Sequence, residues 1–125
     1  KINENLKKIE KKYSELIQRL YKLTKERKLE WRKTSSENEY MLELNAATFA
    51  ISKGIEYYNN SASEFIAVSM YNDKNMVIPI VSVMAGDNEY PFLESLYNEA
   101  VDSCTKETET LEKVLEELDR LDLPF

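Results

Sequence analysis

The stretch EFIAVSMYNDKNMVIPIVSVM, residues 64–84, decides the fold of this chain. Two apolar runs rich in β-branched residues, 64–71 and 76–84, flank the polar tetrad Asn72-Asp73-Lys74-Asn75. Because β-branched residues favour strands and Asn and Asp favour turns, the stretch predicts a β-hairpin. Pro79 has no amide hydrogen to donate, so we expect the second strand at a sheet edge or bulged at that residue.

Two further strands precede this hairpin. Apolar residues alternate over 38–44 and again over 48–53, which is the period of a strand with one buried face. The polar segment 57–63 is predicted to be a loop, so the whole sheet becomes a four-stranded antiparallel meander. Phe65 and Val68 have opposite parity, so one of them must face away from the core unless the strand bulges. The candidate core residues are Tyr40, Leu42, Leu44, Phe49, Ile51, Phe65, Val68 and Met70.

Helical periodicity occurs both before and after the predicted strands in the sequence. Spacings of four and three residues predict a helix over about 2–28, with a heptad seam of Ile2, Leu6, Ile9, Tyr13, Leu16, Leu20 and Leu23. This helix is longer than any of the strands, so we expect its N-terminal third to overhang the sheet. A second helix is predicted from Pro91 to about Leu121, with one face formed by Leu93, Tyr97, Ala100, Cys104, Thr108, Leu111, Leu115 and Leu118. Trp31, just after the first helix, is expected to plug the core.

These patterns predict an α+β fold in a single domain, residues 1–125. Two long helices would pack on one face of a four-stranded antiparallel sheet, in the order α-β-β-β-β-α. The chain length and the 42% apolar content suffice for one modest core.

Charge is unevenly divided along the chain. Residues 1–33 carry 12 Lys and Arg against 5 Asp and Glu, whereas residues 34–125 carry 5 against 18. Pairing of the basic first helix with the acidic last helix within one chain is the favoured interpretation. The alternatives are a protein partner, a homodimer through the heptad seam as a short coiled coil, or nucleic-acid binding by the basic helix. The acidic surface could also imitate nucleic acid, as in a small inhibitor or immunity-type protein.

Two sets of residues are candidate interaction sites. Lys7, Lys8, Lys11 and Lys12 concentrate positive charge at the start of the first helix. Tyr57, Tyr58, Asn59 and Asn60 combine rigid aromatic area with adaptable hydrogen bonds, a combination favoured at interfaces.

Composition argues against catalysis. The chain has no His and only two Gly, which removes most routes to a general base, a metal site or a phosphate loop, so we predict no enzyme activity, cofactor or metal. Cys104 is the only cysteine and is predicted to be a buried, inert thiol, so a cytoplasmic location is expected. The longest apolar run is too short to cross a membrane.

Leu29 and Trp31 end the basic helix in a Leu-x-Trp motif, and Leu96, Tyr97 and Ala100 form Leu-Tyr-x-x-Ala in the closing helix. This layout resembles small bacterial and phage proteins of unassigned activity, with a helix, an antiparallel meander and a helix. The resemblance implies the architecture and supplies no site residues. We therefore predict a non-catalytic protein–protein interaction module with an accessory or regulatory role.

Overall fold

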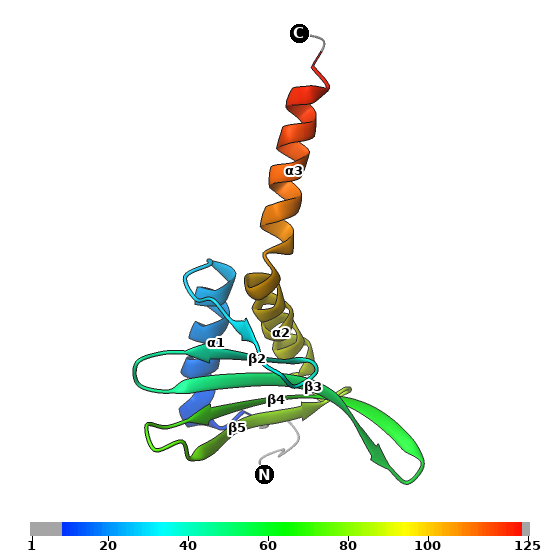
Figure 1. The fold of residues 1–125 in the computed structure, drawn as a ribbon. Coiled ribbons are helices and arrows are strands. Elements are labelled where there is room, and N and C mark those ends of the chain that lie inside the picture. The colour runs from blue at the N-terminus through cyan, green and yellow to red at the C-terminus, as the bar shows by residue number, and fades with distance from the viewer. Residues whose placement is uncertain (1–8, 124–125) are drawn as a thin grey trace.

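The computed structural model describes residues 9–123 and has an α+β architecture built on an antiparallel meander (Figure 1). The strands lie in chain order: β1 (Arg32–Lys33), β2 (Glu39–Glu43), β3 (Thr48–Tyr58), β4 (Ser61–Tyr71) and β5 (Val77–Met84). All neighbours are antiparallel. The prediction of four strands was wrong, because β1 has only two residues and is too short to show alternation.

The hairpin of β4 and β5 is confirmed. The side chain of Asn72 closes its turn by accepting hydrogen bonds from the amides of Lys74 and Met76, at 2.9 and 3.0 Å. β5 is the edge strand, and its pairing shifts between Val81 and Pro79, which leaves one extra residue, as in a β-bulge. The edge position and the bulge expected for Pro79 are both present.

The predicted loop over residues 57–63 is instead the end of a long hairpin. β3 continues to Tyr58 and β4 starts at Ser61, so only Asn59 and Asn60 form the turn. Their φ angles are 50° and 66°, the signs that a two-residue type I′ turn requires. Asn tolerates positive φ better than most residues, so the polar composition that suggested a loop marks a tight turn.

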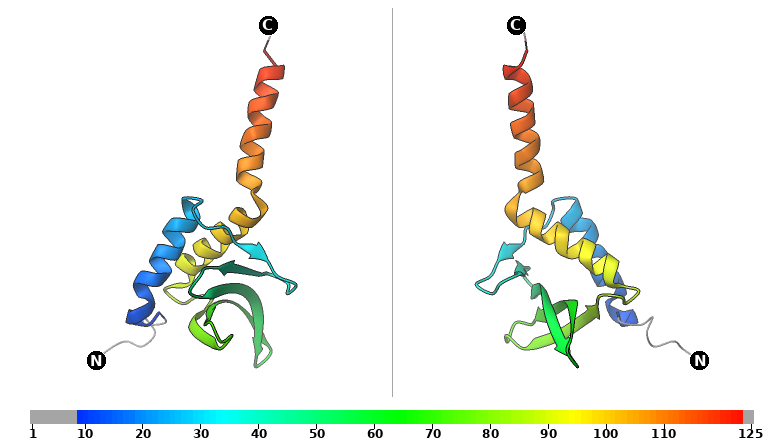
Figure 2. Two further views of the ribbon diagram at one scale, coloured as in Figure 1. Left: turned by 60° about the vertical axis from the view of Figure 1, so that its left-hand side comes forward. Right: turned by 90° about the vertical axis from the view of Figure 1, so that its right-hand side faces the viewer.

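Three helices complete the fold, and the prediction of two long ones was wrong. α1 (Lys11–Lys25) and α2 (Tyr90–Thr105) lie side by side over one face of the sheet (Figure 2). α3 (Glu107–Leu121) extends away from the sheet (Figure 1). α1 ends three residues earlier than predicted, and the expected overhang at residues 1–8 lies outside the described residues.

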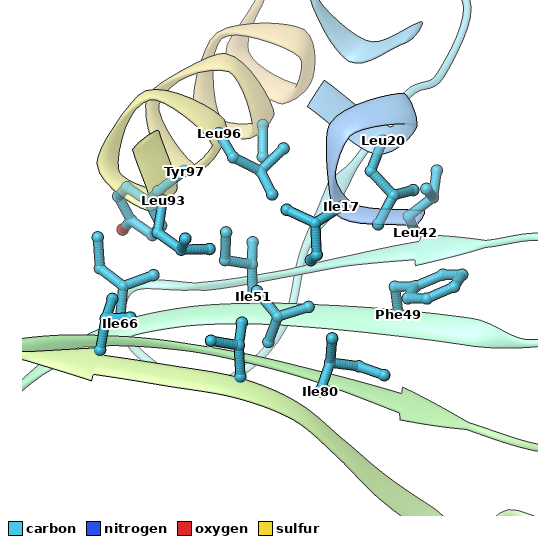
Figure 3. Packing of buried hydrophobic residues seen from close by; sticks show 14 of the residues in the cluster. Ile17, Leu20, Leu42, Phe49, Ile51, Ile66, Ile80, Leu93, Leu96 and Tyr97 are labelled. Carbon is cyan, nitrogen blue, oxygen red and sulfur yellow. The ribbon is translucent and has the colours of Figure 1, made fainter. Parts of the chain in front are cut away.

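The core lies between the sheet and the α1–α2 pair (Figure 3). Of the candidate core residues, Leu42, Phe49, Ile51 and Val68 are buried, while Tyr40 and Met70 pack against the cluster from its edge. Leu44 is 43% exposed, because it lies past the end of β2. The conflict of parity is resolved without a bulge in β4: Val68 faces the helices, and Phe65 lies on the opposite face against Gly54.

Trp31 plugs the core as predicted, at 1% exposure. Its indole N–H donates to the hydroxyl of Thr24 at 2.9 Å, and its backbone N–H donates to the hydroxyl of Ser103 at 3.0 Å. Buried polar groups need such partners, so the indole and the backbone of this one residue together tie the end of α1 to α2.

Candidate interaction surfaces

Arg27 lies just past the C-terminus of α1 in the left-handed backbone conformation, where glycine is the usual residue. The N–H of Lys28 bonds to the carbonyl of Leu23, and that of Arg27 to the carbonyl of Thr24, at 2.9 and 3.0 Å. This is a Schellman motif, whose left-handed residue is usually glycine. The φ of Arg27 is 63°, which costs a residue with a Cβ about 1 to 2 kcal/mol. An arginine at this point therefore needs compensating side-chain contacts.

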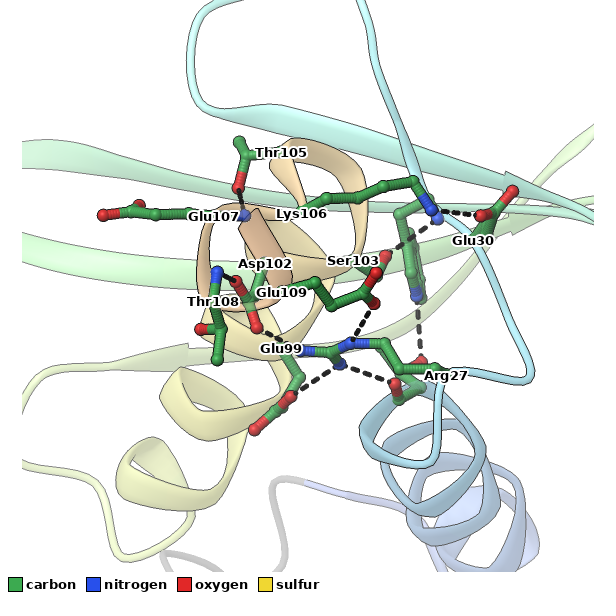
Figure 4. Close-up of polar contacts among 12 residues, drawn as sticks. Arg27, Glu30, Glu99, Asp102, Ser103, Thr105, Lys106, Glu107, Thr108 and Glu109 are labelled. Atoms are coloured by element: carbon green, nitrogen blue, oxygen red, sulfur yellow. Dashed lines mark hydrogen bonds and ion pairs between the residues drawn. The ribbon is translucent and has the colours of Figure 1, made fainter. Parts of the chain in front are cut away.

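The guanidinium of Arg27 finds those contacts on α2 and α3 (Figure 4). It donates to Glu99 at 3.1 Å and to Asp102, and lies 3.5 Å from a carboxylate oxygen of Glu109. The arginine side chain is only 29% exposed, so these contacts are partly shielded from solvent. Within residues 9–123, the predicted pairing of the basic first helix with the acidic closing helices is thus present through Arg27, which directly follows α1.

A second basic residue in the left-handed conformation, Lys106, separates α2 from α3. Its φ is 55°, and its ammonium group pairs with Glu30. The hydrogen bond and charge of Lys106 hold the pKa of Glu30 below its usual value. The prediction of one continuous closing helix was therefore wrong, because the chain turns at Lys106.

We call the turn at Lys106 between α2 and α3 the joint. Side chains at the joint also cap the start of α3. Asp102 accepts a hydrogen bond from the N–H of Thr108 at 3.1 Å with one oxygen, while its other oxygen receives Arg27. The hydroxyl of Thr105 accepts from the N–H of Glu107 at 3.3 Å. Because one carboxylate joins α1, α2 and α3, the cluster sets the direction in which α3 leaves the domain.

α3 is amphipathic, and its apolar face has no contact partner within the described residues. None of its fifteen residues is buried. The apolar stripe has exposures of 43 to 75% and consists of Leu111, Val114, Leu115, Leu118 and Leu121. Such a stripe normally faces a core, and a single helix of this length is marginal in water. The α3 stripe is therefore a strong candidate for an interface.

Acidic side chains lie along both edges of the α3 stripe. At 100° per residue, Glu112 and Asp119 lie along one edge and Glu117 along the other. The two basic residues of α3, Lys113 and Arg120, fall on the opposite face. The stripe is therefore rimmed by acidic side chains.

A groove beside α1 is also apolar at its centre, like the α3 stripe, but basic residues line it. It has a volume of about 430 Å³ and an apolar floor made by Leu16, Leu20, Leu23, Leu29 and Leu44. The heptad seam explains it: Ile17 and Thr24 are fully buried, whereas Leu16 and Leu23 are only half-buried. The helix is thus rotated from the orientation in which the whole seam would face the sheet. Lys12, Glu15 and Arg19 line the groove beside these leucines.

The hairpin tip presents the predicted tyrosines to solvent. Tyr57 and Tyr58 are 75% and 77% exposed, since β3 and β4 continue past the helices that cover the rest of the sheet. Neighbouring Ile55 is 54% exposed. The structure therefore brings Tyr57, Tyr58, Asn59 and Asn60 together on one projecting hairpin.

The predicted basic cluster is only partly described. Lys7 and Lys8 lie outside the described residues, while Lys11 and Lys12 are exposed at the start of α1. The hairpin tip lies on the other side of the molecule, so the two predicted sites are separate (Figure 1). Nucleic-acid binding by α1 and imitation of nucleic acid by the acidic surface stay predictions.

The sequence reasoning missed the joint cluster of Arg27, Asp102 and Lys106. One signal was available, since Thr105 followed by Glu107 and Glu109 is typical of a helix start. Nothing in the sequence marks Arg27, because the expected residue at its position is glycine.

Among residues 9–123, no three His, Cys, Asp or Glu side chains are placed to hold a metal ion. Cys104 is half-buried, so the prediction of a buried thiol was wrong. A cavity of about 570 Å³ lies between α1 and the start of α2 and has a mixed lining of Ile9, Ser14, Ile17, Gln18, Tyr21, Asn88, Glu89 and Phe92. In it the Ser14 hydroxyl accepts a hydrogen bond from Gln18 at 3.0 Å.

Burial and a hydrogen bond change the acidity of Tyr90. Its hydroxyl donates to Glu64 at 3.1 Å, and burial with this neighbour raises the pKa of Tyr90 to about 12. A phenol that keeps its proton to this pH does not act as a general base near neutral pH, and Tyr90, the first residue of α2, packs in the core.

No helix within residues 9–123 has the length and apolar character needed to cross a bilayer. In comparisons with protein-family models, with curated proteins and with solved structures, none matches this chain.

Proposed function

We propose that this protein is a non-catalytic protein–protein interaction module with an accessory or regulatory role in a bacterium-like cytoplasm. One observation carries the proposal: α3 holds five apolar residues on one face and buries none of them. An apolar stripe that stays in water does not stabilise the fold, because it buries no surface. We infer that a second polypeptide covers the stripe. The cytoplasmic location rests on the single cysteine.

The joint cluster supports this role. A docking helix binds better when its orientation is set before the partner arrives, because less conformational freedom is lost on binding. Arg27, Asp102 and Lys106 supply that restraint at the base of α3. The hairpin tip with Tyr57 and Tyr58 offers a second exposed contact surface on the same domain.

Photo-crosslinking in living cells tests the proposal. A photoreactive residue replaces Leu118, in the middle of the stripe, and in a matched variant it replaces Glu116, on the opposite face of the same helix. We expect discrete protein adducts from position 118 and background from position 116. Equal background at both positions would refute an interaction through α3. The same pair of experiments at Tyr57 and at exposed Asp73 tests the hairpin tip.

A further inference from the structure

The α3 stripe and the α1 groove are matched in chemistry. Both have apolar centres: five leucines in the groove floor, and four leucines with one valine in the stripe. Their charges are opposite. α1 has five basic residues against one acidic, a net charge of +4, and α3 has six acidic against two basic, a net charge of −4.

The matching extends to the residues that border each surface. Lys12, Glu15 and Arg19 line the groove, which gives its border a net charge of +1. Arg19 lies 3.6 Å from Glu15 and Lys12 lies 3.9 Å from Glu10, and such exposed pairs are weak enough for a partner's carboxylates to join or replace them. The stripe is bordered by Glu112 and Asp119 on one side and by Glu117 on the other, as shown above. An apolar contact between the two surfaces would therefore place basic side chains opposite acidic ones along its rim.

These two surfaces are held apart within one chain. α3 leaves the domain in a direction set by Arg27 and by the Lys106–Glu30 pair, away from the helix that carries the groove (Figures 1 and 4). Folding α3 back onto its own α1 would break the contacts of Arg27 with Glu109 and of Thr108 with Asp102. The joint thus favours an occupant from outside the chain.

Charge also argues against pairing of two α3 helices. In such a pair the acidic borders of the stripes would face each other, since Lys113 and Arg120 lie on the far side of the helix. Like charges at close range are destabilising, so α1 is the better acceptor for α3.

We propose that α3 of one copy docks into the α1 groove of a second copy, and that the second α3 does the same in return. This makes a two-fold symmetric dimer in which the same contact occurs twice. The inference rests on the proposed function, because it names the partner of the α3 stripe as a second copy of this chain.

Sedimentation equilibrium on the full chain at low salt tests the dimer. We expect a concentration-dependent dimer for the unmodified protein. The pair Lys12→Glu with Arg19→Glu should raise its dissociation constant at least about tenfold, because each dimer loses four rim contacts and gains repulsion. The control pair Lys11→Glu with Lys22→Glu changes the net charge equally, outside the groove, and should leave the constant unchanged within about twofold.

A mixing experiment identifies which surfaces meet. Glu112→Lys with Asp119→Lys should by itself also weaken self-association. An equimolar mixture of this variant with Lys12→Glu/Arg19→Glu should restore a dimer, because opposite charges then meet at both contacts. Pairing of two α3 helices predicts instead that the α1 variant dimerises as tightly as the unmodified chain.

The outcomes separate the two proposals. A chain that is monomeric at every concentration, or an α1 variant as tight as the unmodified protein, would overturn the reciprocal dimer. If position 118 then still crosslinks to another protein, the α3 interaction stands with a different partner. Absence of adducts in cells together with a monomer in solution would reject both.

Discussion

Replacement of Arg27 tests how the base of α3 is held. Arg27→Ala removes the ionic contacts with Glu99 and Asp102 and the longer one with Glu109. Hydrogen bonds between charged groups contribute about 1.5 to 3 kcal/mol each, and the 29% exposure of this side chain reduces that to about 1 kcal/mol. With two close contacts, we expect a loss of about 2 kcal/mol in the free energy of unfolding.

Arg27→Gly separates the side-chain contribution from the backbone contribution. Both variants lose the guanidinium, but glycine adopts a φ of 63° without the steric cost of a Cβ. Arg27→Gly should therefore be more stable than Arg27→Ala by about 1 kcal/mol.

Urea unfolding followed by tryptophan fluorescence measures both variants. Trp31 is the only tryptophan and is 1% exposed, so unfolding moves its indole from the core into water. If Arg27→Ala unfolds within about 0.5 kcal/mol of the unmodified chain, the ionic cluster does not stabilise the joint. If glycine is no better than alanine, the assignment of backbone strain is wrong.

Three further predictions use the same unfolding measurement. The pKa of Tyr90 is raised to about 12 from an ordinary 10, so its contribution is complete below pH 10 and is lost as the pH rises towards 12. In the unmodified chain we expect a loss of about 1.5 to 2 kcal/mol between pH 9.5 and 11.5, which Tyr90→Phe should abolish; an unchanged pH dependence in the variant would contradict the burial argument. Gly54→Ala should cost about 1 kcal/mol, because its Cβ would lie 2.9 Å from the ring of Phe65, which must move; a neutral result would mean that the ring relaxes freely. Leu118→Ser should change the unfolding free energy of the monomer by less than about 0.5 kcal/mol, since Leu118 is 53% exposed, and a larger loss would show that α3 packs within its own chain.

The parts of the fold that sequence reasoning predicted are those governed by local patterns. The hairpin around residues 72–75 combines two apolar runs with a turn that Asn72 closes through its own side chain. Trp31 is large and apolar with a single polar group, so its burial needed only the nearby hydroxyl of Thr24. These features depend on neighbours in the chain.

The parts that were missed depend on contacts between distant residues. Periodicity continues across Lys106 because Leu111 and Leu118 keep the phase of Leu93, and nothing in that pattern shows that the second half lacks a surface to cover. The break requires Glu30, which lies 76 positions earlier. Likewise β1 forms only because Arg32 and Lys33 pair with β2.

The sequence pattern predicted one of the exposed surfaces, and the role of its residues in recognition stays a prediction. Exposure of Tyr57 and Tyr58 agrees with a recognition surface, although they lie in strands and not in a loop. The α3 stripe was predicted to be apolar but was assigned to the core, because amphipathicity indicates that a helix face is covered and does not tell by what.

Because α3 is attached to the domain at the joint, a small change of angle there moves the far end of the helix over a large distance. A helix of fifteen residues is about 22 Å long, so a rotation of 10° at its base moves its far end by about 4 Å. That displacement is perpendicular to the helix axis and about equals the distance over which apolar side chains are in contact, about 4 Å. Angular precision at a few charged side chains therefore decides whether the leucines near the end of α3 reach a given hollow on the opposing surface.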